Sequence, residues 1–315
     1  MTRVAAIDCG TNSLRLLIAQ TGDAESGFLE LLRRVEIVRL GQGVDRTGRL
    51  ADEALRRADL VLAGFAEDLL ERRVELVRAV ATSAMRDAEN SADFLAMVRS
   101  RLGIEPEIVG GEDEARLAFR GAVHEIAGDP DFPTPHCVLD VGGGSTELVW
   151  GDNGSYTGPH LAAAVSMNVG AVRLTERHLG EDPPTVTGLA AARRDVAAAL
   201  DGIGPPPEVG TLIGVAGSVN TVAAVSLGLT EYRPDLLHHV RLRAETVSEV
   251  AERLAAQSHR ERAANPAIHP GRVDVIVAGA LIVDEVVKRL GCSELIVSEH
   301  DILHGIAYRA LDGNA

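Results

Sequence analysis

The sequence predicts an α/β protein of two domains, each with a mixed sheet flanked by helices. The chain has 315 residues, enough for two well-filled cores. Apolar runs typical of buried strands alternate with segments of helical periodicity. A glycine-bearing hairpin also occurs twice, around Asp8 and Asp140, at an offset of 132 residues (140 minus 8). The duplication indicates two related domains.

The two hairpins read AAIDCGTNSLRLLIA and CVLDVGGGSTELVWG. At the common offset Gly10 aligns with Gly142 and Ser13 with Ser145. Each copy predicts a strand, a tight turn and a second strand, because apolar residues flank glycines that adopt backbone shapes closed to other residues. Such a turn exposes consecutive N–H groups that bind phosphate oxygens, and its leading carboxylate can hold a cation. One hairpin alone is usually just a turn, but two predict a clamp around a phosphorylated ligand.

The remaining elements of the first half follow from periodicity. We expect a strand over residues 29–38 and a helix over 51–72, whose apolar stripe faces the core. A strand over 74–81, a helix ending near 102 and a short strand over 106–109 come next. A helix beginning after Gly110 and Gly111 has three acidic residues in its first turn.

The second half follows the same plan. A loop rich in proline and glycine over 128–135 separates the halves, and a buried strand from 211 leads into a glycine turn and a helix. Residues 270–280 open a long apolar helix, 295–298 form a strand, and 301–311 form a closing helix that we expect to pack on the first domain. The predicted domains are therefore 1–118 plus 299–315, and 119–298.

Composition excludes several classes of protein. The formal net charge of −15 argues against a nucleic-acid partner, and no apolar run approaches the roughly 20 residues that span a membrane. The first strand starts without a signal peptide, and three widely spaced cysteines form no disulfide framework. We therefore expect a cytoplasmic protein, and the sequence leaves a homodimer open.

With both hairpins, ATSAMRDAEN, GGEDEARLAF, MNVGAVRLTE and RVDVIVAGA in one order, the chain resembles the exopolyphosphatase and guanosine pentaphosphate phosphatase family from Val4 to about Gly305. That family belongs to the acetate kinase, sugar kinase, Hsp70 and actin superfamily. The resemblance implies two actin-like domains with the active site in the cleft between them.

The resemblance also implies roles for residues of the two hairpins. Asp140 and Glu147 match acids that help to hold Mg²⁺, a role that suits hard oxygen ligands. The alternative is that Glu147 faces solvent on its strand. The residues that match the two phosphate loops of the family are Asp8, Gly10, Thr11, Asn12 and Ser13 in the first, and Gly142, Gly143, Gly144 and Ser145 in the second.

The same resemblance assigns the chemistry. Glu114 matches a glutamate that activates the attacking water, and Arg86 matches an arginine that contacts phosphate. The residues alone leave another interpretation open, in which Glu112, Asp113 and Glu114 only complement the helix dipole.

Four further assignments are weaker. Gly217 and Ser218 match a third glycine turn, which would meet the far end of the substrate. Arg15 is either an anion contact or a structural ion pair, and Arg173 is either a ligand contact or a salt bridge between domains. His300 and His304 stand four residues apart, a spacing that suits metal ligands, although surface or interdomain contacts are favoured.

The sequence thus predicts a Mg²⁺-dependent exopolyphosphatase that removes the terminal phosphate of inorganic polyphosphate. Because the net charge is −15 and no further domain follows residue 315, we expect short chains to be preferred. The alternatives are hydrolysis of guanosine pentaphosphate or another nucleotide by the same machinery, an ATP-dependent kinase, and a non-catalytic sensor of phosphate or nucleotide.

Overall fold

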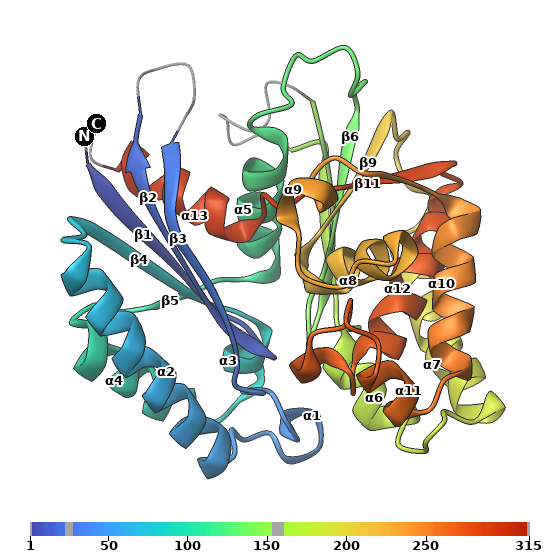
Figure 1. Cartoon of the computed structure of the whole chain (residues 1–315), viewed down its shortest axis with the longest axis horizontal. Coiled ribbons are helices and arrows are strands. Elements are labelled where there is room, and N and C mark those ends of the chain that lie inside the picture. Colours follow the sequence, from blue (N-terminus) through green and yellow to red (C-terminus); the bar gives the residue numbers. More distant parts are fainter. Residues whose placement is uncertain (1, 23–27, 153–160, 314–315) are drawn as a thin grey trace. The chain divides into compact units, whose positions relative to one another are not determined.

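The computed structural model describes residues 2–22, 28–152 and 161–313 (Figure 1). The chain divides into two compact units. Unit 1 comprises Met1–Gly121 and Ile302–Ala315, and unit 2 comprises Ala122–Asp301. Both crossings between the units lie three residues later than the predicted domain boundaries; the predicted end points 1 and 315 themselves fall outside the described residues.

Unit 1 contains a five-stranded mixed sheet of order β3-β2-β1-β4-β5. β1 pairs antiparallel with β2 and parallel with β4. Its elements are β1 (Arg3–Cys9), β2 (Ser13–Thr21), β3 (Phe28–Ile37), α1 (Val44–Thr47), α2 (Asp52–Glu71), β4 (Leu76–Ala81), α3 (Ser83–Asp87), α4 (Ser91–Leu102), β5 (Glu107–Ile108), α5 (Gly111–Val123, which ends in unit 2) and α13 (Ile302–Asp312).

Helices cover both faces of this sheet. Ala5 and Ile7 of β1 share a hydrophobic cluster with α2 and α4, whereas Val4 and Ala6 share one with α5 and α13. This alternation follows from the period of two along a strand. The predicted closing helix is therefore α13, and its Ile302, Leu303 and Ile306 are buried in unit 1.

Unit 2 contains a six-stranded mixed sheet of order β10-β11-β9-β6-β7-β8. Its elements are β6 (His136–Val141), β7 (Thr146–Gly151), β8 (Ala163–Met167), α6 (Ala171–His178), α7 (Val186–Asp201), β9 (Thr211–Val215), α8 (Ala216–Leu227), α9 (Pro234–Leu237), β10 (Arg241–Arg243), α10 (Ala244–Ala256), α11 (His259–Ala263), the 3₁₀ helix η1 (Pro270–Arg272), α12 (Ile276–Leu290) and β11 (Glu294–Val297). The apolar helix expected from Pro270 begins only at Ile276, after the 3₁₀ turn.

The two sheets repeat one plan. In unit 2, β6 pairs antiparallel with β7 and parallel with β9, as β1 pairs with β2 and β4. β8 extends β7 in the way that β3 extends β2. The duplication read from the hairpins thus extends to the whole sheet, and the predicted fold class of mixed sheets flanked by helices is confirmed. No helix within the described ranges is long and apolar enough to cross a membrane.

Candidate functional site

The second glycine turn joins β6 to β7 and is held by its own carbonyl groups. The carbonyls of Gly142 and Gly143 accept hydrogen bonds from Ala171 N–H (2.9 Å) and Val172 N–H (2.8 Å), at the start of α6. The carbonyl of Gly144 accepts from Arg173 Nε at 2.9 Å. In a trans peptide the carbonyl and the next N–H point in opposite directions. The N–H groups of residues 143–145 therefore point away from α6, side by side, as a phosphate nest requires.

The first glycine turn, between β1 and β2, has the same construction. Gly10 N–H donates to Ser13 O at 3.0 Å, as Gly142 N–H donates to Ser145 O at 3.0 Å. The carbonyl of Thr11 accepts from Gly41 N–H at 2.7 Å, and that of Asn12 accepts from Arg39 N–H at 2.8 Å. The N–H groups of residues 12 and 13 accordingly point away from the loop that follows β3.

Two carboxylates lie opposite one another at the second turn. Asp140 of β6 and Glu147 of β7 are direct cross-strand partners, so their side chains share one face of the sheet. Both are buried, at 6% and 1% exposure. Ser166 of β8 donates its hydroxyl to Glu147 at 2.6 Å. The burial rules out the interpretation in which Glu147 simply faces solvent, and the pair is a donor set suited to a hard divalent cation.

The first turn carries an ion pair at the corresponding position. Asp8 and Arg15 are cross-strand partners, as Asp140 and Glu147 are. Both Nε and Nη2 of Arg15 lie 2.7 Å from Asp8 Oδ2, and the Asp8 side chain is 3% exposed. Of the two interpretations of Arg15, the structure shows the ion pair.

Glu114 differs from the two acids beside it on α5. Glu112 and Asp113 are exposed, and Glu112 pairs with Arg116 one turn along the helix. Glu114 is buried and accepts a hydrogen bond from Arg86 of α3 at 2.7 Å. The same Arg86 nitrogen donates to the Val109 carbonyl at 2.8 Å, which fixes the guanidinium. The structure thus brings together the two predicted catalytic residues.

The environment of Glu114 prepares it to accept a proton near neutral pH. Burial raises the pKa of its carboxyl to about 7, against the lowering effect of the Arg86 guanidinium. Asp8 raises the pKa further and Arg15 lowers it, so the four charged groups are electrostatically linked within unit 1. A role limited to the helix dipole would not place the carboxylate in such a site.

The residues of the predicted third glycine turn belong to a helix in the structure. Gly217 and Ser218 lie in the first turn of α8, and the Ser218 side chain is buried. A Cβ atom on Gly217 would lie only 1.8 Å from Cζ of Arg272, and one on Gly279 would lie 2.5 Å from Ser218 Oγ. The serine hydroxyl therefore packs against α12, whereas the arginine guanidinium lies over Gly217. Sequence reasoning missed Arg272; the only signal was a basic residue in the stretch PGRVD.

Two minor predictions concern Arg173 and a pair of histidines. Arg173 donates to the Gly144 carbonyl within unit 2, so it supports the second turn; its roles as a ligand contact or a salt bridge stay predictions. Of the two interpretations of His300 and His304, the structure shows separate contacts in place of a metal pair: His304 is fully buried beside Glu30 of unit 1 at 3.1 Å, whereas His300 lies 3.0 Å from Glu125 of unit 2. Because His304 is buried, the interpretation in which it makes a surface contact is wrong.

The two sites define a class of protein: a duplicated α/β fold with a candidate phosphate-binding hairpin in each unit, one beside a candidate general base and one beside a candidate cation site. Sequence comparison gives a more specific result. The model of the Ppx/GppA phosphatase family matches residues 17–314, and the chain belongs to this family.

Individual relatives agree. Exopolyphosphatase 2 of Mycobacterium tuberculosis is 44% identical, over 98% of both chains. The crystal structure of an exopolyphosphatase-like protein has 39% identity and a TM-score of 0.93, with full coverage of both chains. That of the Aquifex aeolicus Ppx/GppA family member has 30% identity and a TM-score of 0.81, over 100% of this chain and 99% of that one.

Proposed function

We propose that the protein is an exopolyphosphatase, which transfers the terminal phosphoryl group of inorganic polyphosphate to water and releases orthophosphate. The observation that carries this proposal is Glu114, a buried carboxylate whose pKa is raised to about 7 beside the first phosphate-binding turn. A group of this kind accepts a proton from water at neutral pH, which hydrolysis requires and simple phosphate binding does not. The name of the relative with 44% identity supports the same reaction.

Each unit carries candidate groups for this reaction. The N–H groups of the two turns bind phosphate oxygens, and the carboxylates Asp140 and Glu147 fit Mg²⁺. The ion, when bound, neutralises charge on the phosphates. Glu114 takes a proton from the water whose oxygen attacks the terminal phosphorus, while the bond from phosphorus to the bridging oxygen breaks.

Two arginines complete the anion-binding groups. Arg86 holds Glu114 and retains further N–H groups for a phosphate oxygen, because a guanidinium carries five donors. Arg272 lies over Gly217, where it supplies positive charge at the place predicted for the far end of the substrate. Because the net charge of −15 repels polyanions, binding depends on such local groups, and we expect short chains to be preferred.

The closest alternative is removal of the terminal 5′ phosphate of guanosine pentaphosphate, whose phosphoanhydride end presents the same reacting group. A kinase would need an acceptor other than water, and a non-catalytic sensor would not need a buried base. We place the enzyme in the cytoplasm, in accord with its three free cysteines. Light scattering will distinguish a monomer from a homodimer.

The experiment is a phosphate-release panel with short polyphosphate, long polyphosphate, guanosine pentaphosphate and ATP, each with Mg²⁺ and with Mg²⁺ chelated. Glu114→Gln, purified identically, tests the general base, and a mock purification from cells that lack the protein controls for contaminating phosphatases. We expect the highest kcat/KM on short polyphosphate. With Mg²⁺ chelated, we expect no phosphate release from any substrate. Higher efficiency on guanosine pentaphosphate would favour the alternative, and release that persists in Glu114→Gln would overturn the mechanism.

A further inference from the structure

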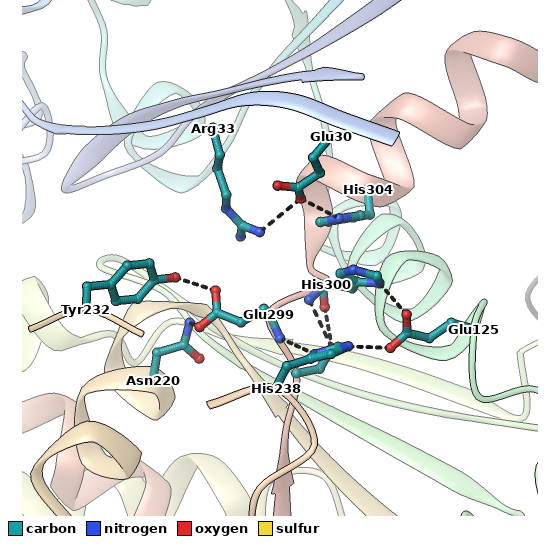
Figure 2. A network of polar contacts seen from close by, with 10 residues as sticks. Glu30, Arg33, Glu125, Asn220, Tyr232, His238, Glu299, His300 and His304 are labelled. Carbon is teal, nitrogen blue, oxygen red and sulfur yellow. Dashed lines mark hydrogen bonds and ion pairs between the residues drawn. The ribbon is translucent and has the colours of Figure 1, made fainter. Parts of the chain in front are cut away.

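A cluster of histidines surrounds one carboxylate in unit 2, apart from the two turns. Glu125 follows α5, His238 follows α9, and His300 follows β11. One ligand atom from each residue lies within 4.8 Å of those of the other two. Figure 2 shows the His238 and His300 side chains meeting the Glu125 carboxylate. Three segments distant in sequence thus converge on one point.

The distances between these three side chains suit the binding of one metal ion. Nε2 of His238 lies 2.5 Å from Oε1 of Glu125, and Nδ1 of His300 lies 3.0 Å from Oε2. The two imidazole rings have centroids 4.7 Å apart. Four-coordinate metal ions hold nitrogen and oxygen atoms at about 2.0–2.2 Å, which leaves neighbouring ligand atoms slightly over 3 Å apart. A small outward shift of the carboxylate would accommodate an ion.

We propose that Glu125, His238 and His300 form a binding site for a borderline divalent transition-metal ion, with Zn²⁺ as the leading candidate. Two imidazole nitrogens and one carboxylate favour Zn²⁺, Co²⁺ or Ni²⁺ over Mg²⁺ and Ca²⁺, which prefer oxygen. The site is therefore chemically distinct from the Asp140 and Glu147 pair. The side chains of the three residues are 25–31% exposed, so an ion can reach them from solvent.

The surroundings hold the ligands in place. His239 stacks on His238 with ring centroids 3.9 Å apart, and its Nε2 lies 2.8 Å from Glu125 Oε1. The Glu125 carboxylate is thus in contact with three imidazole rings, which hold it in place.

Binding has one structural consequence. Without an ion, Nδ1 of His238 accepts the Glu299 N–H at 3.1 Å, so the proton of the neutral ring lies on Nε2 and is donated to Glu125. An ion on Nε2 requires the other tautomer, and the Glu299 amide must then find another acceptor. The Glu299 carboxylate accepts hydrogen bonds from Asn220 (2.8 Å) and Tyr232 (Figure 2). The ion would therefore act on the segment that leads into α13.

The test uses the full-length protein, stripped with chelator and titrated with Co²⁺ and then Zn²⁺. We expect one equivalent of Co²⁺ per chain, with visible absorption of a site containing nitrogen ligands, and displacement by Zn²⁺. His238→Ala and His300→Ala should each weaken the affinity at least tenfold. His178→Ala is the matched control, because its imidazole also pairs with a carboxylate, Asp195, at 2.7 Å; it should bind Co²⁺ like the wild type.

The Co²⁺ titration of the wild-type protein tests the proposal even if a variant folds poorly. Absence of stoichiometric Co²⁺ binding, or an absorption spectrum typical of six oxygen ligands, would overturn the proposal. An unchanged Co²⁺ affinity in both histidine variants would also overturn it, provided that their melting temperatures show that they are folded. None of these readouts depends on phosphate release, so they remain informative whichever substrate the enzyme hydrolyses.

Discussion

The two glycine hairpins share a backbone and differ in charge. In both, the first glycine donates to the serine carbonyl three residues later, and the turn carbonyls face a supporting segment. In the first hairpin Asp8 lies opposite Arg15, whereas in the second Asp140 lies opposite Glu147. The residue opposite the first carboxylate is thus a cation, whereas the residue opposite the second is another carboxylate.

This difference assigns separate tasks to two copies of one motif. Unit 1 combines its turn with the candidate base Glu114 and needs no ion to balance Asp8. Unit 2 combines its turn with two acids, which make it the half with the candidate cation site. The duplicated backbone provides the N–H groups in both copies, and the residue opposite the aspartate sets the charge beside them.

Glu114→Gln tests the task of unit 1 and should have the largest effect. The amide keeps the shape and hydrogen-bonding reach of the side chain but cannot take a proton from water, so kcat should fall by roughly 10²- to 10⁴-fold. KM should fall slightly, because a negative charge facing the polyanion is removed. Steady-state kinetics and a melting curve provide the check. Near-normal kcat with a lowered melting temperature would reopen Glu112 and Asp113 as candidates.

Arg15→Gln removes the built-in counter-ion of the first hairpin. It leaves Asp8 buried without its cation, and we expect the free energy of unfolding to fall by about 3 kcal/mol. Chemical denaturation measures this loss. The control is Arg116→Gln, whose ion pair with Glu112 is exposed and should contribute less than about 1 kcal/mol. Equal effects of the two variants would contradict the buried role of Arg15.

Asp140→Asn and Glu147→Gln test the task of unit 2. Each removes one charge from the pair, and we expect the Mg²⁺ concentration for half-maximal activity to rise roughly 10- to 100-fold. Mg²⁺ titrations of phosphate release give the value. Arg15→Gln, assayed below its melting transition, should leave that concentration near the wild-type value. Unchanged titration curves for both acid variants would remove the pair from the metal site.

Gly41→Ala and Gly170→Ala test the shared backbone. A Cβ on Gly41 would lie 2.2 Å from Thr11 Cγ2, and one on Gly170 would lie 2.4 Å from the Gly143 carbonyl oxygen. Each supporting segment approaches its turn where only glycine fits, so each variant should lose about 1–3 kcal/mol of stability. Gly180→Ala, with open space around the added methyl group, is the control. Losses no larger than in Gly180→Ala would show that the turns do not need this contact.

The pH profile tests the electrostatic link within unit 1. Because the pKa of Glu114 is raised to about 7 and the base acts when deprotonated, kcat/KM should rise with pH through about 7. Arg86 lowers that pKa, so Arg86→Gln should move the rising limb upward by roughly one pH unit, in addition to any loss of rate. A limb that stays in place would show that Glu114 is not the titrating group.

The sequence by itself determined the duplicated α/β fold, because the glycine spacing and apolar periodicity of each hairpin are local patterns. It also singled out Glu114, Arg86, Asp140 and Glu147 as candidate site residues, through motifs of adjacent residues. The pairing of Glu114 with Arg86, 28 residues away, needed the packing of α3 beside α5. The raised pKa of Glu114 likewise depends on burial, which no single segment specifies.

Contacts between distant segments were decided only by the tertiary structure. The spacing of His300 and His304 suggested a local pair, yet His304 turns to Glu30 and His300 to Glu125, 175 residues earlier. Arg272 meets Gly217 across 55 residues, and Arg173 reaches back to the Gly144 carbonyl. A short motif records which residues can bind or react. Which side chains meet depends on how the sheets and helices pack. This packing is driven by the free energy of burying apolar surface, which local spacing in the sequence does not specify.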